Sequence, residues 1–278
     1  MIQVESLHRL TDDQFNKLSD LVFYHSGIVI SNDKRTLLES RLSKRVRTLK
    51  LAGLSAYYQY LNENKDQELI HLLDVVTTNV TSFFRENSHF KILTDDLLVP
   101  KIQQIKQGND KNELSIWSAG CSTGEEAISI LISLLEVIDD DSINIKVLAT
   151  DLSLKCLQAA NSAKYSKHHF TKFSEIMLKK YFIEEDNYYV AKPVITSKIT
   201  WRHFNLKNSF RFENKFDAIF CRNVMIYFNQ AFRDSLVERF RNNLRSDGML
   251  FVGLSESLNR KKLKLQYHSP SVYINKGI

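Results

Sequence analysis

A glycine-rich segment in the middle of the chain has the residue types and spacing of a ligand-binding loop. It reads SAGCSTGEE over residues 118–126, after an apolar run and before a helical pattern. Gly120 and Gly124 allow a sharp turn and a close approach of the backbone to a ligand, and the N–H groups at the helix start favour an anion. The GxxxG spacing differs from the GxGxxG of dinucleotide-binding folds. An ordinary tight turn between strand and helix would also explain the segment.

Asp151, in the segment ATDLS, ends a second apolar run. A carboxylate at the carboxyl end of a strand can accept hydrogen bonds from both hydroxyl groups of a ribose, as in dinucleotide-binding folds. The same side chain could instead cap the next helix. The glycine-rich segment favours the ribose interpretation, because ligands of open α/β sheets bind beyond the carboxyl ends of the strands.

Two further polar side chains follow a later apolar run, in FDAIFCRNVMIYF over residues 216–228. Asn223 comes directly after the run and Tyr227 one helical turn later, so an amide and a phenol could face the same cleft. Tyr227 could equally be a buried aromatic residue with a satisfied hydroxyl group. Before the first run, TTNVTSFFRE over residues 77–86 places Asn79, Thr81 and Arg85 around two phenylalanines, as in a linker folded over a site.

These segments must be positioned by the elements around them. From about residue 114, short β-rich runs alternate with helical stretches, which is typical of a parallel α/β sheet. Strands are expected at Leu114–Ala119, Ile145–Thr150, Ile199–Phe204, Phe216–Cys221, Met249–Leu254 and Ser271–Asn275. Helices are expected at Thr123–Val137, Leu154–Ala163 and Ala231–Leu244. The last strand follows its neighbour without a crossover helix, which predicts an antiparallel strand at the sheet edge. Phe170–Pro193 predicts an irregular insertion or lid.

The first quarter of the chain predicts a small all-helical module. Thr11, followed by two aspartates, can cap a helix that Gly27 ends. A second helix is expected from about Ser31 or Asn32 to Lys50, and its apolar stripe at helical spacing consists of Leu38, Leu42, Val46 and Leu49. Two shorter helices are expected from Ser55 through Leu61 and from Gln67 to Val76.

Composition narrows the class of protein. The 278 residues suggest about two domains, and 43% hydrophobic with 25% charged residues is ordinary for a globular chain. The longest apolar stretch is too short to span a bilayer, and the N-terminus lacks the layout of a signal peptide. Three cysteines without a CxxC pair fit neither a disulfide framework nor a structural zinc site, so no metal and a cytoplasmic location are expected. A net charge of +6 favours acidic partners.

The segments TTNVTSFFRE, WSAGCSTGEEAISI, ATDLS, FDAIFCRNVMIYF and GLSESL, in this order, resemble the CheR family of chemotaxis receptor methyltransferases. The resemblance runs over nearly the whole chain. It implies S-adenosylmethionine-dependent methylation of glutamate side chains on the cytoplasmic signalling region of chemoreceptors, with S-adenosylhomocysteine as product. It implies a Rossmann-like class I methyltransferase sheet over residues 77–278, mostly parallel with an antiparallel last strand and an insertion or subdomain at about 170–200. A small all-helical substrate-docking domain over residues 1–76 would precede the sheet.

The resemblance also implies roles for individual residues. Asp151 would hold the ribose, Asn205 and Leu206 would flank the adenine, and Arg85 and Tyr227 would act where the methyl group is transferred. The full set implied to bind the cofactor is Asn79, Thr81, Arg85, Gly120, Glu125 or Glu126, Asp151, Asn205, Leu206, Asn223 and Val224.

Three positions depart from the family pattern. Leu254 stands where many relatives have histidine, and Ala127 replaces a proline that often follows GEE. The segment Tyr181–Phe204 is short compared with relatives whose inserted β-subdomain grips the C-terminal pentapeptide of a receptor. A pentapeptide tether is therefore not expected for this chain.

One side of the second helix carries four cations, Lys34, Arg41, Lys44 and Arg45. A run of charges can simply be a solvated helix face. It can also dock an acidic partner, and in the family resemblance this module faces the helical bundle of the receptor. Arg41 and Arg45 are the contacts expected.

Other functions fit the sequence less well. Base-amino methylation of nucleic acids commonly uses an Asn/Asp-Pro-Pro-aromatic loop, but the prolines are isolated at positions 100, 193 and 270, and none precedes a cysteine as cytosine methylation needs. A nicotinamide dehydrogenase would need GxGxxG. A non-catalytic module, or a CheR-like protein of a signalling pathway outside motility, remains as an alternative.

Overall fold

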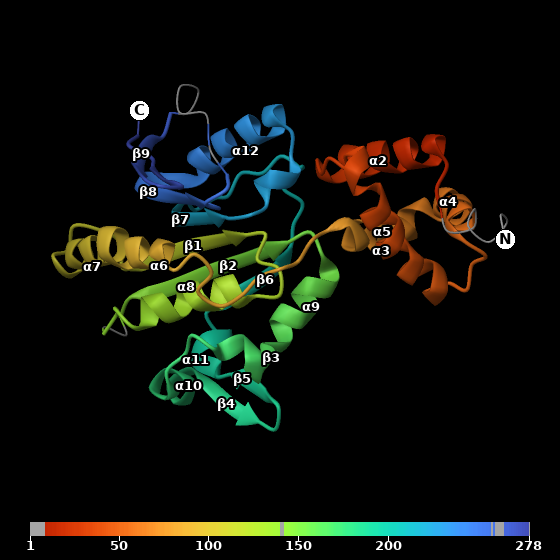
Figure 1. The fold of residues 1–278 in the computed structure, drawn as a ribbon. Coiled ribbons are helices and arrows are strands. Elements are labelled where there is room, and N and C mark those ends of the chain that lie inside the picture. The colour runs from red at the N-terminus through yellow and green to blue at the C-terminus, as the bar shows by residue number, and fades with distance from the viewer. Residues whose placement is uncertain (1–8, 140–141, 257, 259–263, 278) are drawn as a thin grey trace. The chain divides into compact units, whose positions relative to one another are not determined.

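The computed structural model describes residues 9–139, 142–256, 258 and 264–277, so Ser257 of the GLSESL segment lies outside the described residues. The chain forms two compact units (Figure 1). The helical unit contains the residues up to Thr78 together with Asn205–Lys207 and Tyr227–Phe232. The sheet unit contains Asn79–Phe204, Asn208–Ile226 and the residues from Arg233 onward. No helix in the described part of the chain is long and apolar enough to cross a membrane.

Short amphipathic helices build the helical unit. Their bounds are α2 (Asp12–Ser26), η1 (Asn32–Lys34), α3 (Arg35–Thr48), α4 (Leu54–Glu63) and α5 (Lys65–Val76). As predicted, Thr11 caps α2: its side chain accepts the N–H of Gln14, whose side chain returns to the N–H of Thr11 in a capping box. Gly27 ends α2 with a φ of 76°. The core between these helices consists of fully buried residues such as Leu18, Leu42, Tyr57, Leu61 and Leu72.

The chain returns to the helical unit far downstream in the sequence. Ile28 forms an antiparallel bridge with Phe228, and the N–H of Val29 donates to the carbonyl oxygen of Tyr227 at 2.8 Å. A Cβ built on Gly27 would lie 2.4 Å from the ring of Phe232. Residues 227–232 are thus part of the packing that follows α2.

The sheet unit is built on a seven-stranded sheet in the order β6-β2-β1-β7-β8-β10-β9. The strands are β1 (Glu113–Ala119), β2 (Asn144–Asp151), β6 (Ile199–His203), β7 (Phe216–Cys221), β8 (Leu244–Val252), β9 (Gln266–Ser269) and β10 (Val272–Ile274). All pairs from β6 to β8 are parallel, whereas β10 is antiparallel to both neighbours. The mostly parallel α/β fold and the antiparallel last strand are confirmed.

The predicted position of the last strand is wrong. The strand at residues 272–274 is not the sheet edge, because the unpredicted β9 pairs with its outer side. β9 consists of Gln266–Ser269, four largely polar residues that carry no apolar alternation, so the pattern that reveals a half-buried strand is missing there.

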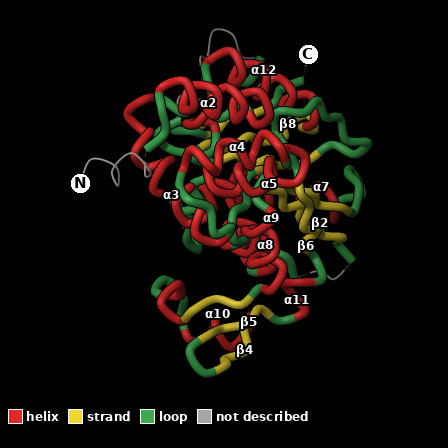
Figure 2. Tube along the Cα trace, turned by 90° about the vertical axis from the view of Figure 1, so that its right-hand side faces the viewer, coloured by secondary structure: helices red, strands yellow, loops and turns green. Residues whose placement is uncertain are grey.

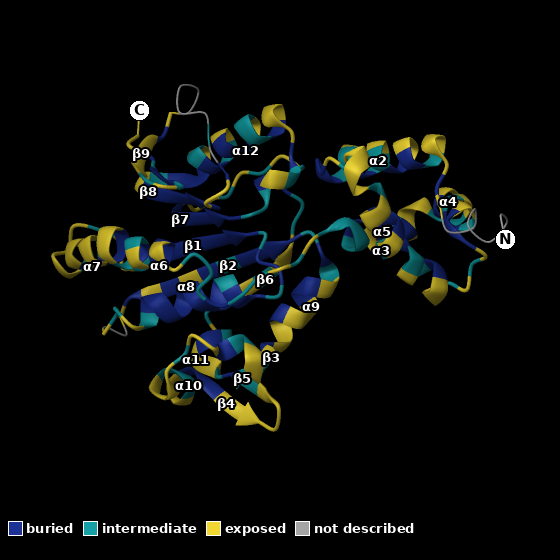
Figure 3. Cartoon of the chain, in the orientation of Figure 1, coloured by how far each residue is buried: buried dark blue, intermediate teal, exposed yellow. Residues whose placement is uncertain are grey.

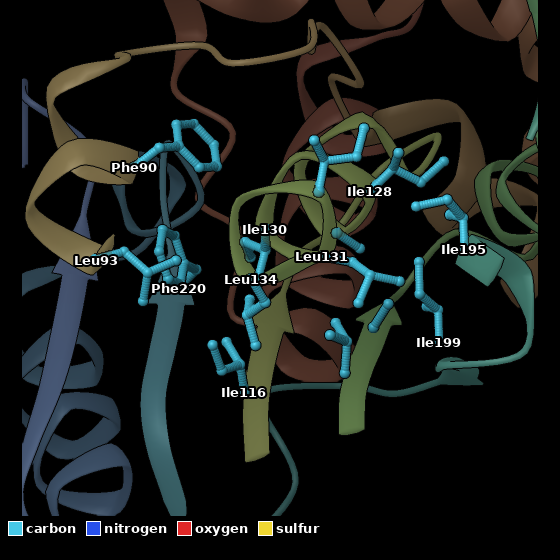
Figure 4. Close-up of a cluster of buried hydrophobic side chains, with 14 of the residues drawn as sticks. Phe90, Leu93, Ile116, Ile128, Ile130, Leu131, Leu134, Ile195, Ile199 and Phe220 are labelled. Carbon is cyan, nitrogen blue, oxygen red and sulfur yellow. The ribbon is translucent and has the colours of Figure 1, made fainter. Parts of the chain in front are cut away.

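Helices cover both faces of the sheet through alternating side chains. Ile116 of β1 joins a buried cluster with α8 (Glu125–Leu135), which Figure 4 shows packed over the strands. The next residue, Trp117, lies on the other face, 5.3 Å between ring centroids from Phe240 of α12 (Gln230–Asn243). Figure 3 shows the central strands buried along their length. Because β1 pairs in parallel with both β2 and β7, the carboxyl ends of these three strands lie at one edge of the sheet.

Residues 88–106, which are not among the predicted helices, form a helical segment before β1. It consists of α6 (Ser88–Ile92), the π-helix η2 (Leu93–Leu98) and α7 (Val99–Lys106). This segment packs on the sheet unit through Phe90, Leu93 and Leu98, whose side chains are buried in the same cluster as those of α8.

The predicted irregular insertion is instead a folded substructure. A three-stranded antiparallel sheet has the order β3-β5-β4 and is seen apart from the main sheet in Figure 2. Its elements, with α9 before it, are α9 (Leu154–Ser162), β3 (Lys164–Ser166), η3 (Lys167–Phe170), α10 (Glu175–Tyr181), β4 (Phe182–Glu185), β5 (Tyr188–Ala191) and α11 (Pro193–Thr196). Three of the four residues of β4 are exposed, so this hairpin lacks the apolar pattern that predicts a strand.

Candidate active site

The glycine-rich loop between β1 and α8 is shaped by Gly120. This residue has a φ of 91°, a conformation that L side chains rarely adopt, and a Cβ there would lie 2.4 Å from Cγ2 of Val224. Its N–H donates to the carbonyl oxygen of Thr150 at 2.8 Å. Two residues predicted to bind the cofactor, Gly120 and Val224, are thereby brought into contact although they are far apart in the sequence.

Asp151 lies at the end of β2 and faces the same loop. Its Oδ2 accepts the N–H of Ser122 and its Oδ1 accepts the N–H of Ser153, both at 2.8 Å. The cap of α9 is Ser153, whose Oγ accepts the N–H of Cys156 at 3.1 Å. The alternative that Asp151 caps this helix is therefore wrong. Its carboxylate is held against the glycine loop.

The segment before the sheet contacts this loop, as the sequence predicts. The carbonyl oxygen of Asn79 accepts the hydroxyl of Ser122 at 3.1 Å, and Arg85 Nη1 donates to the carbonyl oxygen of Val80 at 2.9 Å. The segment, which also includes the half-buried Thr81, is anchored by Phe83, a fully buried residue. The ring of Phe83 contacts the rings of Tyr165, Phe170, Phe173 and Phe182.

A buried guanidinium that no local sequence pattern singles out joins these segments. Arg222 follows β7, and its side chain is only 2% exposed. Its Nη2 lies 3.1 Å from Glu86 Oε2 and its Nη1 lies 3.3 Å from Glu126 Oε2. It also donates to the carbonyl oxygen of Arg85. One cation thus ties together the linker, the glycine loop and the end of β7.

The two glutamates of the GEE motif have different surroundings. Glu126 accepts the hydroxyl of Ser118 at 2.7 Å and pairs with Arg222, and burial raises the pKa of this carboxyl. Glu125 accepts the hydroxyl of Thr123 at 2.6 Å and lies 3.2 Å from His169. Glu126 is therefore the one that pairs with Arg222, which also holds the backbone of Arg85.

Glu256 fixes the backbone around Asn223. Its carboxylate accepts the N–H groups of Gly253 at 2.6 Å, Asn223 at 2.8 Å and Ile226 at 3.1 Å. Burial raises the pKa of this carboxyl, and the N–H groups that it accepts partly offset the rise. Asn223 has a φ of 59°, and its Nδ2 lies 3.4 Å from Glu86 Oε1. The acceptor for this turn is thus Glu256 of GLSESL, a role that local sequence does not reveal.

His89 is a fully buried titratable group beside this cluster. Its Nδ1 lies 3.5 Å from Glu86 Oε2, and its ring packs on Phe251 at 5.8 Å. Burial, followed by the charge of Arg222, lowers the pKa of His89 to about 4. The imidazole is therefore neutral at pH 7.

Three of the residues predicted to bind the cofactor or to act in methyl transfer belong to the helical unit. Asn205 Nδ2 donates to the carbonyl oxygen of His25 at 2.6 Å, and the neighbouring Leu206 is buried. Tyr227 is half-buried, and Lys34 Nζ lies 5.6 Å from the centroid of its ring. The remaining predicted cofactor residues lie in the sheet unit.

The four predicted docking cations differ in what they contact. Arg41 donates to the carbonyl oxygen of Val76 at 2.8 Å and to the hydroxyl of Thr78 at 2.9 Å, so it supports the end of α5. Arg45 makes two contacts with the buried Glu68, at 2.8 and 2.6 Å. Lys34 and Lys44 are exposed. The two lysines are the members of the set that a variant can change without disturbing these internal contacts.

The site at the carboxyl ends of β1, β2 and β7 fits S-adenosylmethionine. Because Gly120 has no Cβ, the Val224 side chain packs directly against the backbone of the loop. The Asp151 carboxylate suits ribose hydroxyls, and the Asn223 amide can both donate and accept hydrogen bonds to an amino acid group. These donor and acceptor types match a molecule with a ribose and a zwitterionic end.

Comparisons with known proteins agree over the full length of both units. Residues 13–77 match the family model "CheR methyltransferase, all-alpha domain", and residues 79–274 match "CheR methyltransferase, SAM binding domain". The chain is 34% identical over 269 residues to the chemotaxis protein methyltransferase of Borreliella burgdorferi, covering 95% of this chain and 94% of the relative. It is 30% identical over 279 residues to that of Escherichia coli, covering 98% and 94%. The chain therefore belongs to the CheR family of S-adenosylmethionine-dependent methyltransferases.

Proposed function

We propose that this enzyme transfers a methyl group from S-adenosylmethionine to glutamate side-chain carboxylates of chemoreceptors, giving glutamate methyl esters and S-adenosylhomocysteine. The observation that carries the proposal is the cluster of Gly120, Asp151 and Asn223 at one edge of the sheet, in a chain of this family. The relatives named chemotaxis protein methyltransferases support chemoreceptors as the substrate class.

In this proposal the sheet unit holds the cofactor and the chain's own residues align the reactants. When bound, S-adenosylmethionine supplies an electrophilic methyl group, which a carboxylate oxygen takes as the carbon–sulfur bond breaks and its electron pair stays on sulfur. Asp151 holds the ribose, and Asn223 with Val224 contacts the methionine part. Asn79, Thr81, Glu125 or Glu126, Asn205 and Leu206 complete the binding set that the resemblance implies.

No general base is required on the protein. A glutamate side chain has a reference pKa of about 4.3, so at neutral pH the substrate carboxylate is already ionised. Catalysis then rests on alignment, which can contribute as much as about 7–11 kcal/mol. Arg85 orients the carboxylate and Tyr227 donates a hydrogen bond to one of its oxygens. Arg85 already donates to Val80, which moderates its pairing with the carboxylate and leaves the second oxygen nucleophilic.

The proposed partner is the cytoplasmic signalling region of a chemoreceptor, so the enzyme is proposed to act in the cytoplasm without nucleic acid and without entering the membrane. The cationic side of α3, with Lys34, Arg41, Lys44 and Arg45, is the proposed docking surface. A C-terminal pentapeptide tether is not part of the proposal, because the segment Tyr181–Phe204 is short compared with that of relatives that grip such a peptide. Removing the last five residues of a receptor should leave its methylation rate unchanged.

The test uses methyl-labelled S-adenosylmethionine and membranes that carry candidate chemoreceptors. Mild base cleaves a carboxyl methyl ester but leaves N-methyl groups, so base-labile label on the receptor is the expected result. Base-stable label, or no transfer by a protein that still binds S-adenosylmethionine, would contradict the proposal. Asp151→Ala serves as the control for cofactor-dependent labelling.

A further inference from the structure

The small sheet of β3, β5 and β4 contacts the glycine-rich loop through Tyr165 of β3. Tyr165 is 5% exposed, and its hydroxyl donates to the carbonyl oxygen of Thr123 in this loop at 2.8 Å. Burial, followed by the charge of Glu125, raises the pKa of the Tyr165 phenol well above its ordinary value. The hydroxyl is therefore protonated at neutral pH and remains a donor to the loop.

The same hydroxyl packs against the start of α8. A Cβ built on Gly124 would lie 2.8 Å from the hydroxyl oxygen of Tyr165 and 2.9 Å from the ring of Trp201 in β6. The backbone of Gly124 is thus in close contact with both the small sheet and the main sheet. Because the other glycine of the loop packs against Val224, the loop is held at both of its glycines.

Tyr165 also contacts the segment that precedes the main sheet. Its ring meets the buried ring of Phe83 edge-on, with 5.0 Å between the centroids. Phe83 anchors the segment that carries Asn79 and Arg85, two of the residues proposed to bind the cofactor. Edge-to-face aromatic pairs contribute stability beyond the area that they bury. Tyr165 thus contacts two separate segments of the proposed cofactor site.

Two side chains that follow β3 contact the same two segments. Nδ1 of His169 lies 3.2 Å from Oε1 of Glu125 at the start of α8. Lys172 donates to the carbonyl oxygen of Phe84 at 3.2 Å. The His169 side chain is 31% exposed and Lys172 is exposed, so water weakens both contacts. Tyr165 is the buried member of this set.

We infer that Tyr165 is a positioning residue for S-adenosylmethionine, and that it couples the order of the small sheet to the order of the glycine-rich loop. The inference rests on the proposed placement of the cofactor against this loop. Without the phenol hydroxyl, the loop occupies its binding conformation in only a fraction of the molecules, and the apparent affinity falls in proportion to that fraction. Saturating cofactor holds the loop in place again, so the rate of methyl transfer at saturation is unchanged.

The first experiment removes the hydroxyl. Tyr165→Phe keeps the ring against Phe83 but cannot donate to Thr123. We expect the Kd for S-adenosylhomocysteine, measured by calorimetric titration, to rise about tenfold, equal to about 1.4 kcal/mol. In receptor methylation, the KM for S-adenosylmethionine should rise by a similar factor while kcat stays near the wild-type value.

Tyr181→Phe is the matched control. Tyr181 of α10 is 1% exposed, and its hydroxyl donates to Glu136, directly after the last residue of α8. Each variant loses one hydrogen bond to one end of the same helix, so both should unfold at a temperature about 2–4 °C lower. Only Tyr165→Phe should lose affinity for the cofactor. Equal losses of affinity in the two variants, or a wild-type Kd in Tyr165→Phe, would overturn the inference.

The second experiment uses the wild-type protein, so it does not depend on the fold of a variant. Coupling is reciprocal, so a cofactor that orders the loop also orders β3. Addition of S-adenosylhomocysteine should slow the hydrogen exchange of the paired strands β3 and β5 more than that of β10, near the other edge of the main sheet. An equal effect on both regions, or none on β3, would contradict the coupling.

The failure of the proposed cofactor site gives a different result. In that case Asp151→Ala binds S-adenosylhomocysteine with the wild-type Kd, and the role of Tyr165 falls together with the site. If Asp151→Ala binds weakly while Tyr165→Phe binds like the wild type, only the role of Tyr165 is overturned. The titrations contain no receptor, so their outcome does not depend on which side chains accept the methyl group.

Discussion

At the scale of single residues, Arg222 is the charge on which the sheet unit's site depends. Its guanidinium is almost fully buried between the carboxylates of Glu86 and Glu126 and also holds the backbone of Arg85. Removing one partner of a buried ion pair leaves an uncompensated charge, which costs roughly 3–5 kcal/mol. The network therefore contributes to stability and supports residues that are proposed to bind the cofactor.

Arg222→Gln should lower the free energy of unfolding by roughly 3–5 kcal/mol and weaken S-adenosylmethionine binding. Arg222→Lys should recover part of the stability, since it restores the charge but not the planar fork that reaches two carboxylates. Urea unfolding and calorimetric titration with S-adenosylmethionine measure the two effects. Wild-type stability together with wild-type affinity in Arg222→Gln would contradict this account.

The lowered pKa of His89 predicts that the stability of the protein depends on pH. Its folded-state pKa is about 4, against 6.5 for an ordinary histidine, so the unfolded chain binds more protons between these values. The contribution of neutral His89 to the free energy of unfolding is fully present above pH 6.5. It is lost as the pH falls toward 4, which lowers the free energy of unfolding by about 3 kcal/mol. In His89→Phe, which keeps a ring against Phe251, the unfolding free energy should change less steeply over this range. Equal slopes in the two proteins would show that His89 does not contribute.

At the scale of elements, Gly120 lets the proposed cofactor-binding loop pack closely against Val224. Gly120→Ala combines an unfavourable φ with a Cβ that would clash with Val224. Gly108→Ala is the matched control, because Gly108 has a φ of 73° but nothing within 4 Å of a built Cβ.

Gly108→Ala should lower the free energy of unfolding by about 1–2 kcal/mol, the cost of placing an L residue at a positive φ. Gly120→Ala should lose more than this and should also bind S-adenosylmethionine more weakly. Thermal unfolding and titration with the cofactor separate the two. Similar losses in both variants, with unchanged cofactor affinity, would remove the argument for a tight approach at this loop.

How far the sequence predicts the structure depends on how local each signal is. The cap at Thr11 and the stop at Gly27 directly flank α2, so the bounds of this helix can be predicted from local sequence. The glycine loop and Asp151 follow strands with strong apolar patterns, and the topology of a parallel sheet brings them together. In contrast, Arg222 pairs with Glu86 and Glu126 across 136 and 96 residues, and no local pattern identifies such partners. The small sheet and β9 are missed because their exposed strands carry little apolar alternation.

At the scale of the whole molecule, the net charge of +6 favours an acidic partner. Raising the salt from about 0.1 M to about 1 M shortens the Debye length from about 10 Å to about 3 Å. The KM for the receptor should therefore rise with salt, while the Kd for S-adenosylmethionine changes little.

Lys44→Glu should raise the KM for the receptor roughly two- to fivefold. This change corresponds to the free energy of one or two exposed ion pairs. Lys215→Glu, an exposed lysine of the sheet unit, is the control with the same change in net charge. Steady-state methylation at low salt measures both. Equal effects of the two substitutions would mean that only net charge matters and that α3 is not the docking surface.

The return of residues 227–232 to the helical unit limits how this protein can have been assembled and inherited. A fragment that ends at Thr78 lacks Phe228 and Phe232, the partners of Ile28 and Gly27. The unit is therefore not a cassette that recombination can exchange at a single boundary. A chimaera that takes only the first 78 residues from a relative combines residues 27 and 28 of one protein with residues 228 and 232 of another. A chimaera that also takes residues 227–232 keeps the original contacts.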